Sequence, residues 1–207
     1  MTSLLLYKQL FVYLIPFNVL IGEYNLGMQY RIGEEWAVDL NLGYVDDTEG
    51  ALTAELYQDI LQSGVFYYHG PLVKVSALSL VPRGPNPLKT DYNQLEFACR
   101  FLRYDNLDFE DENEPGKLFN ISEQMKAVSL SWKAGYIIVP RNTFEMNGFV
   151  GFGIQTRFKN TIVNSYGTNY QSNVFILNDV SSSIQFVPLF HAGIKIGLKT
   201  PLKESSQ

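Results

Sequence analysis

Apolar and polar residues alternate along most of this chain with a period of two. Residues 183–199 show the pattern best, because Ile184, Phe190 and Ile194 fall on one set of alternate positions. The other set becomes small and charged toward Lys199. A β-strand points successive side chains to opposite faces, so this stretch predicts a strand with one apolar face.

The same alternation recurs often enough to predict eight strands. They cover residues 4–15, 22–32, 36–44, 72–81, 91–103, 123–138, 144–158 and 183–199. The first strand is the weakest prediction, since both of its faces are apolar. Short turns are expected at 33–35, 82–87 and 139–142, and long loops at 45–69, 104–122 and 159–182, with one short link at 16–19.

The polar face of these strands distinguishes a sheet in water from a sheet in lipid. In a soluble antiparallel sheet the outer face carries many Lys, Glu and Thr residues. Here the polar face is rich in Gly, Ala and Ser with isolated charges of both signs, which suits the crowded inside of a narrow barrel. We therefore expect an all-β fold, an eight-stranded antiparallel up-and-down transmembrane β-barrel with a filled polar lumen.

This barrel is expected to be a single domain over residues 1–199, followed by a short polar tail over residues 200–207. Membrane barrels place their short turns in the periplasm and their long loops outside. Because the number of strands is even, both chain ends are expected in the periplasm.

Charged residues on the polar face are expected to pair inside the barrel, since an unpaired buried charge is unfavourable. With one histidine they form the predicted lumen network: Glu23, Arg31, Asp39, Lys74, Glu96, Arg100, Lys133, Glu145, Arg157, His191 and Lys195.

Aromatic residues on the apolar face lie near the expected strand ends, where membrane barrels carry interfacial girdles. The predicted girdle residues are Tyr30, Trp36, Tyr136 and Phe144 near the short turns, and Tyr44 and Phe158 near the long loops.

Composition narrows the choice of protein class. The mean hydropathy is −0.05, and no run of 18 apolar residues is free of charge, which argues against a spanning helix. The formal net charge of −5 argues against a general nucleic-acid surface. A single cysteine, Cys99, excludes an internal disulfide. Lys8 interrupts the first apolar stretch and no basic segment precedes it, so a strand is favoured over a signal peptide.

Two segments resemble a known family. Residues 14–45, LIPFNVLIGEYNLGMQYRIGEEWAVDLNLGYV, combine an apolar strand containing Pro, a Gly-Glu-Tyr-Asn-Leu-Gly run, a Tyr-Arg pair, a tight turn and a Trp that opens the next strand. Residues 188–199, PLFHAGIKIGLK, form a closing strand. Together they cover roughly a fifth of the chain and resemble small outer-membrane barrels of Bacteroidetes-type bacteria, the family of unknown function DUF3575. The resemblance implies a Gram-negative outer membrane and a barrel fold, and it implies no reaction.

Candidate chemistry is sparse. His191 faces the predicted lumen, where Glu145 or Ser131 could approach it across the barrel, although a histidine in an ionic network is the more common case. His69 has no second histidine nearby, which argues against zinc. The acidic stretch 105–114 lacks the EF-hand spacing and is expected to be a solvated loop. Residues 52–61 have helical spacing. The sequence predicts no metal and no cofactor.

Three functions are compatible with these patterns. The first is a non-enzymatic outer-membrane barrel, surrounded by membrane lipid and lipopolysaccharide, that acts as a structural or accessory subunit and binds another outer-membrane protein. The second is a lipid A-modifying barrel enzyme that uses His191 or His69. The third is a soluble lipocalin-like carrier, whose apolar face would point inward.

Overall fold

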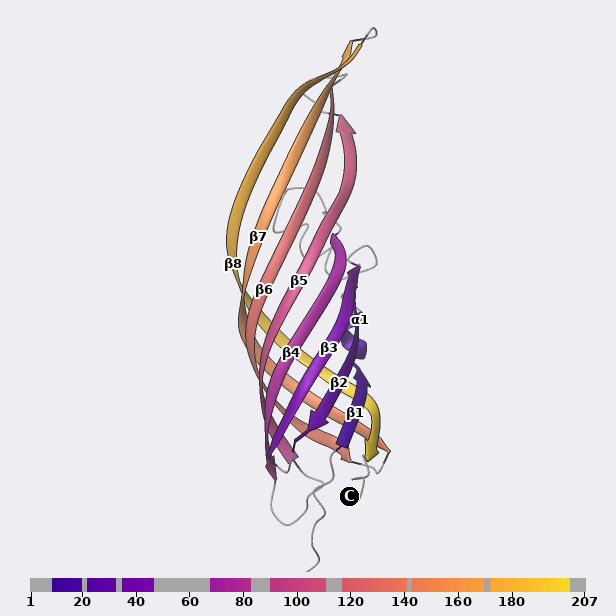
Figure 1. Cartoon of the computed structure of the whole chain (residues 1–207), viewed down its shortest axis with the longest axis vertical. Coiled ribbons are helices and arrows are strands. Elements are labelled where there is room, and N and C mark those ends of the chain that lie inside the picture. Colours follow the sequence, from indigo (N-terminus) through magenta and orange to yellow (C-terminus); the bar gives the residue numbers. More distant parts are fainter. Residues whose placement is uncertain are drawn as a thin grey trace, which may run out of the picture.

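The computed structural model describes residues 9–19, 22–32, 35–46, 68–82, 90–110, 117–140, 143–169 and 172–201. This part of the chain is a succession of antiparallel strands with one short helix (Figure 1). The elements are β1 (Gln9–Leu14), α1 (Pro16–Val19), β2 (Glu23–Arg31), β3 (Trp36–Asp46), β4 (Tyr68–Pro82), β5 (Thr90–Glu110), β6 (Lys117–Pro140), β7 (Phe144–Asn169) and β8 (Ser172–Pro201).

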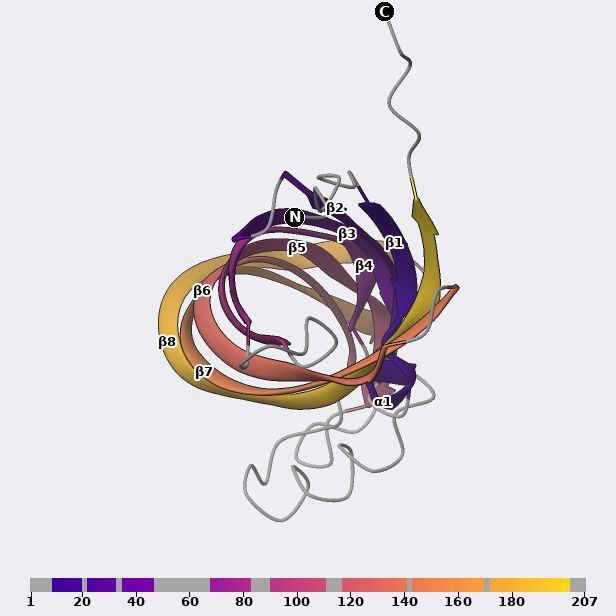
Figure 2. The ribbon, with the colours of Figure 1, turned by 90° about the horizontal axis from the view of Figure 1, so that it is seen from below.

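Each strand pairs antiparallel with the next, and β1 also pairs with β8, so the sheet closes into a barrel (Figure 2). The closing contact runs from Gln9 opposite Pro201 to Leu14 opposite Ile196. The all-β, eight-stranded antiparallel architecture predicted from the sequence is confirmed. The first and last strands meet at the end of the barrel where the short connections lie (Figure 1).

The strands are staggered around the ring. Across the closing contact, Leu10 of β1 pairs with Thr200 of β8. Following the paired residues from Leu10 the other way around the ring, through β2 to β7, leads to Phe190 of β8. Phe190 lies ten residues before Thr200 in the chain. With a rise of about 3.3 Å per residue and about 4.8 Å between strands, this stagger gives a strand tilt of about 40°. Eight strands at this tilt enclose an interior that side chains can just fill.

Strand length rises around the ring from 6 residues in β1 to 30 residues in β8. The upper parts of β5 to β8 therefore extend beyond the closed ring as an open sheet (Figure 1). The long loops predicted at 104–122 and 159–182 were wrong, because β5 and β6 pair as far as Glu110 and Leu118, and β7 and β8 pair as far as Asn169 and Ser172. These stretches carry polar residues on both faces, so the period-two signal is weak although backbone pairing continues.

Other predicted segments lie wholly or partly outside the described residues. These are residues 4–8 of the first strand, the turns at 33–34, 83–87 and 141–142, the acidic residues 111–114, the expected helix at 52–61 within the loop at 45–69, and the end of the tail at 202–207. The tail was expected to begin at residue 200, but Thr200 and Pro201 still belong to β8 and pair with β1.

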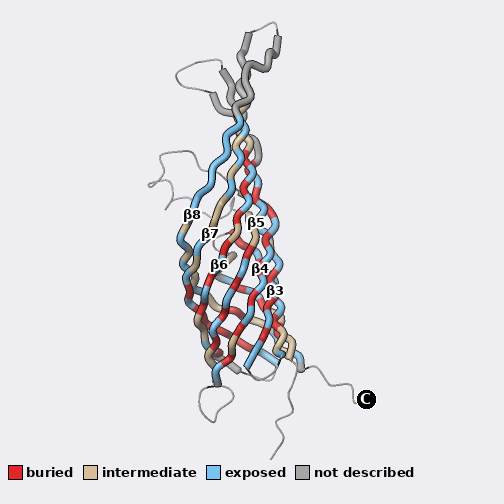
Figure 3. Tube along the Cα trace, turned by 60° about the vertical axis from the view of Figure 1, so that its left-hand side comes forward, coloured by how far each residue is buried: buried red, intermediate tan, exposed pale blue. Residues whose placement is uncertain are grey.

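Buried and exposed residues alternate along the strands (Figure 3). Most of the exposed residues are apolar, and many of the buried residues are polar. In β3, the side chains of Val38, Leu40 and Leu42 are exposed, whereas those of Asp39 and Asn41 are buried. This is the opposite of the arrangement that water favours, in which apolar groups fill the interior.

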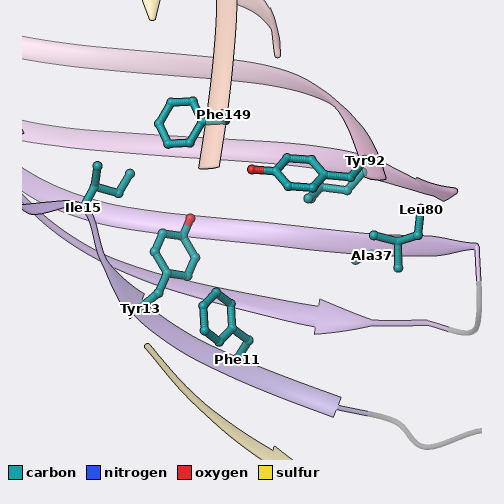
Figure 4. Close-up of a cluster of buried hydrophobic side chains, with 8 residues drawn as sticks. Phe11, Tyr13, Ile15, Ala37, Leu80, Tyr92 and Phe149 are labelled. Atoms are coloured by element: carbon teal, nitrogen blue, oxygen red, sulfur yellow. The ribbon is translucent and has the colours of Figure 1, made fainter. Parts of the chain in front are cut away.

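An apolar cluster fills part of the interior that the sequence predicted to be polar (Figure 4). It consists of Phe11, Tyr13, Ile15, Ala37, Leu78, Leu80, Tyr92 and Phe149. Gly27 has no side chain there because a Cβ atom would lie 2.1 Å from the Tyr13 ring. The cluster was missed because β1 is apolar on both faces, so the sequence did not indicate which of its side chains point inward.

We expect Leu78→Ala to lower the free energy of unfolding by about 2–5 kcal/mol, because it leaves a cavity in a packed cluster. Leu78 is completely buried, whereas Val75 on the outer face of the same strand is 51% exposed. Val75→Ala is therefore the matched control and should change stability much less. Chemical unfolding followed by tryptophan fluorescence measures both, and equal losses for the two variants would contradict this assignment of faces.

Candidate functional site

The interior of the barrel is held by ion pairs between strands that are distant in the sequence. Lys195 on β8 is almost completely buried, and its Nζ lies 2.7 Å from Asp39 Oδ2 on β3. Lys195 also donates to Gln94 Oε1, and the Tyr13 hydroxyl donates to Asp39 at 2.7 Å. The ammonium group lies 4.7 Å from the centroid of the Tyr13 ring. Each charge therefore has an opposite charge and further polar or aromatic contacts, as a buried ion pair requires.

A second group of charges lies around Glu23 on β2. Its carboxylate accepts hydrogen bonds from Lys74 on β4 and, at 3.1 Å, from Arg100 on β5. Asn18 of α1 and Asn25 donate to the same Oε1 atom at 2.9 Å and 2.7 Å. Asn18 thereby links α1 to the start of β2. The Glu23 carboxylate connects α1, β2, β4 and β5.

A third pair joins β5 to β6. Lys133 Nζ lies 2.6 Å from Glu96 Oε2, and the amide of Gln94 donates to Ser76 Oγ at 2.6 Å. Phe149 of the apolar cluster lies beside this pair, with the Lys133 ammonium 5.2 Å from its ring centroid. The third pair thus borders the apolar cluster.

Further ion pairs lie toward the two ends of the barrel. Glu145 Oε2 lies 2.5 Å from Lys199 Nζ near the closing seam. At the opposite end, Lys159 Nζ lies 3.1 Å from Glu123 Oε1, which also accepts a hydrogen bond from the Tyr68 hydroxyl. Sequence analysis missed Lys199, Glu123 and Lys159 as network members. Lys199 belongs to the polar set of its strand, whereas Lys159 was assigned to a loop.

The predicted network comprises several groups, and Gln94 links two of them because it accepts from Lys195 and donates to Glu96 at 3.5 Å. Glu23, Lys74 and Arg100 come together, as do Asp39 with Lys195 and Glu96 with Lys133. Arg157 donates to Gln155 at 2.7 Å, and Arg31 is partly exposed at the end of β2. No ion pair of either arginine is found among the described residues, and their pairing inside the barrel stays a prediction.

His191 lies inside the barrel with its Nε2 atom 2.9 Å from Ser131 Oγ. Ser131 was one of the two partners considered from the sequence, and Glu145 pairs with Lys199 instead. Ser131 is only 2% exposed. Among the described residues no carboxylate is hydrogen-bonded to His191, so the serine and histidine lack the third group that orients a catalytic histidine.

The predicted girdle residues lie on the outer surface. Trp36, Tyr136 and Phe144 are exposed and Tyr30 is partly exposed, all toward the end of the barrel with the short connections. Tyr44 and Phe158 are exposed nearer the other end.

Other chemistry is limited in the described residues. His69 lies on β4 opposite Asp46 and Arg103. In this part of the chain no three His, Cys, Asp or Glu residues are grouped so that they could hold a metal ion. No described helix is long and apolar enough to cross a membrane.

The chain matches no protein-family model, no curated protein and no solved structure. Its function therefore has to be argued from the arrangement of its own residues. That arrangement consists of a barrel whose interior is cross-linked by ion pairs and whose outer surface is apolar.

We expect Lys195→Met to lower the free energy of unfolding by about 3–5 kcal/mol, because it leaves the Asp39 carboxylate buried without its cation. The double variant Asp39→Asn, Lys195→Met removes both charges and should recover most of that loss. Chemical unfolding of the single and double variants measures the coupling. Equal destabilisation by the single and the double variant would contradict a coupled buried pair.

Proposed function

We propose that this protein is a small outer-membrane β-barrel of a Gram-negative bacterium and spans the membrane with its eight strands. The observation that carries the proposal is the inverted arrangement of its faces. Thirty large apolar or aromatic side chains of the described part are exposed, while Asp39, Glu96 and Lys195 are buried. Soluble monomers rarely expose apolar patches larger than a few hundred Å². In a bilayer, lipid hydrocarbon would surround the barrel, so these apolar side chains would not be exposed to water.

The height of the apolar surface fits a bilayer. On β3 the exposed apolar run extends from Trp36 to Tyr44. Along β2 and the residue after it, the outward apolar run extends from Tyr24 to Ile32 and includes the partly exposed Tyr30. At a tilt of about 40°, each residue rises about 2.5 Å along the axis, so each run spans about 20 Å between its end Cα atoms. Membrane barrels carry an apolar band about 25 Å tall with aromatic residues at its borders.

The same fold supports the proposed location in the envelope. Short connections in the periplasm would put both chain ends there, since Gln9 and Pro201 are paired at that end. The resemblance of residues 14–45 and 188–199 to DUF3575 barrels points to the same compartment. In this environment the contacts of the outer surface are membrane lipid and lipopolysaccharide.

We propose a structural or accessory role, in which the barrel binds another outer-membrane protein. A conducting role is disfavoured because the apolar cluster and the ion pairs occupy the interior. A soluble lipocalin-like carrier is disfavoured because such a carrier needs apolar residues lining a cavity and polar residues outside.

Spin labelling in lipid bilayers tests the membrane assignment. In a Cys99→Ser background, nitroxides at Leu40, Phe97 and Val150 should be reached by oxygen, which dissolves in lipid, and not by a water-soluble nickel chelate. A nitroxide at Asn160, an exposed polar position, is the matched control and should show the reverse. Equal accessibility of the nitroxides at Val150 and Asn160 to oxygen and to the nickel chelate, in a protein that is soluble without detergent, would contradict the membrane proposal.

Extraction in mild detergent followed by mass measurement tests the accessory role. A stable complex containing a second outer-membrane protein is the expected result. A strictly monodisperse monomer under all extraction conditions would contradict a stable partner.

The contact between Ser131 and His191 supports one alternative, a barrel enzyme that hydrolyses or transfers lipid acyl groups. A nucleophile beside a base is the minimum for such chemistry. Because Ser131 is buried and its histidine has no described carboxylate partner, we expect Ser131→Ala and His191→Ala to leave lipid A and phospholipids unchanged. Mass spectrometry of lipids from expressing cells measures this, with Ser129→Ala as the matched control. A lipid change made by the wild type and lost in both variants, but kept in the control, would establish the enzyme.

A further inference from the structure

The upper part of β8 has a free edge. β1 pairs with β8 only from Ile196 to Pro201, and above Lys195 no described strand pairs with β8 on the side away from β7. Helix α1 contacts both β8 and β2, and Ile15 lies close to Gly193, so the lowest part of this side is covered. Above this covered part, β8 continues far beyond the end of β1 (Figure 1).

The direction of the backbone groups on this edge can be deduced from one hydrogen bond. The Lys199 N–H donates to the carbonyl of Thr143, which lies on the β7 side. Backbone groups of successive residues point to opposite edges of a strand. The even-numbered residues of β8 therefore direct their N–H and C=O groups toward β1 in the lower part and toward the free edge in the upper part. This holds as far as the irregularity opposite Ser165.

Side chains beside this edge are among the most exposed apolar groups of the described residues. Phe190 is 81% exposed, Phe186 is 71% exposed and Val180 is 65% exposed. On the inner side the neighbouring Ser183 and Gln185 are also exposed. The edge therefore offers a row of backbone hydrogen-bonding groups with an apolar side and a polar side.

Apolar and polar rows alternate toward the upper part of this edge. One outward row contains Phe101 on β5, Lys126 on β6, Phe158 on β7 and Ile184 on β8. The next outward row is polar and consists of Arg103, Gln124, Asn160 and Ser182. Above it, Ile162 on β7 and Val180 on β8 are again apolar and exposed. The apolar side of the edge is therefore interrupted at Ser182.

We propose that the free edge of β8 from Val180 to Phe190 binds an extended segment of a partner protein by adding one strand to the sheet. The occupant continues the interface that β1 already makes with the lower part of the same edge. It runs in the direction of β1, antiparallel to β8, with β-branched or aromatic side chains facing outward and polar side chains facing inward. This inference rests on the proposed membrane location only for the exclusion of a second copy as the occupant.

A second copy of the chain is not the occupant. Copies in one membrane share an orientation, so a two-fold axis along the membrane normal makes both β8 strands run toward the periplasm. With a tilt of about 40° each, the two strands would cross at about 80° and could not form a ladder. Pro188 adds to this, because it has no N–H to offer at the free edge and limits uninterrupted pairing between identical edges.

The test uses the full-length protein in nanodiscs of phosphatidylethanolamine and phosphatidylglycerol. The probe is a fluorescent twelve-residue peptide of alternating valine and threonine, which can supply either face of a strand. We expect saturable binding by fluorescence anisotropy. A peptide N-methylated at alternate residues, on the set that faces β8, should not bind, because it cannot donate backbone hydrogen bonds. Equal binding of both peptides, or no binding of the first, would overturn the proposal.

Two variants of Ile184 distinguish binding by backbone hydrogen bonds from binding by nonspecific apolar contact of the side chain. Ile184→Pro removes an N–H that faces the free edge and leaves the β7 ladder intact, as Pro188 already does at an equivalent position. Loss of that hydrogen bond should weaken peptide binding about fivefold to tenfold. Ile184→Thr keeps the N–H and should bind within about threefold of the wild type. If Ile184→Thr binds as weakly as Ile184→Pro, backbone pairing is not the mode of binding.

Spin labels distinguish lipid from protein as the natural cover of this edge. A nitroxide at Phe186 that is as accessible to oxygen as one at Phe152 would show that lipid covers the patch, and would overturn the proposal. A nitroxide at Phe186 that is reached by the nickel chelate, and is shielded when the peptide binds, supports it. Nitroxides at Leu40 and Val150 test the membrane proposal separately. A failure of the membrane proposal can therefore be distinguished from a failure of the strand-addition proposal.

Discussion

The pairing of β1 with β8 is the constraint on which the rest of this structure depends. It involves only the six residues of β1, yet it turns a sheet with two different faces into a barrel with an inside and an outside. Once the ring is closed, every polar residue on the inner face must find a partner within a narrow lumen. The ion pairs are the consequence, and they also strengthen the closure. Lys195 on β8 reaches Asp39 across the seam, and the two residues are 156 positions apart in the chain.

The lumen is filled by groups of different chemistry. An apolar cluster built from β1, β3, β4, β5 and β7 contacts the Asp39–Lys195 pair through Tyr13 and Tyr92. The Glu96–Lys133 pair borders the same cluster. The Glu23 group also joins α1 to three strands. Such pairs are expensive to bury and sensitive to the loss of one partner, so they define which strands belong together more than they add net stability. An interior of this kind is suited to a rigid scaffold.

The outer surface and the free edge of β8 are linked by the unequal strand lengths. Hydrocarbon cannot hydrogen-bond to a strand edge, so a membrane barrel must cover or close every edge within the bilayer. Here β1 and α1 cover the lower part of β8, and the strand continues beyond them with alternate backbone groups unpaired in the described structure. The proposed accessory role and the proposed strand addition arise from the same geometric fact, that one side of the barrel wall is shorter than the other.

The alternation of the sequence determined the strand number, the antiparallel order and which residues share a face, because a period of two leaves only two possible sides. It also gave the composition of the inner face, including Asp39, Glu96 and Lys195. Tertiary structure alone decided which charges meet, since pairing across a ring depends on stagger and tilt. The sequence therefore did not identify Glu123 and Lys199 as members of the network. Only the closed fold revealed the apolar cluster, the long upper strands and the free edge of β8, because each depends on where a neighbouring strand ends.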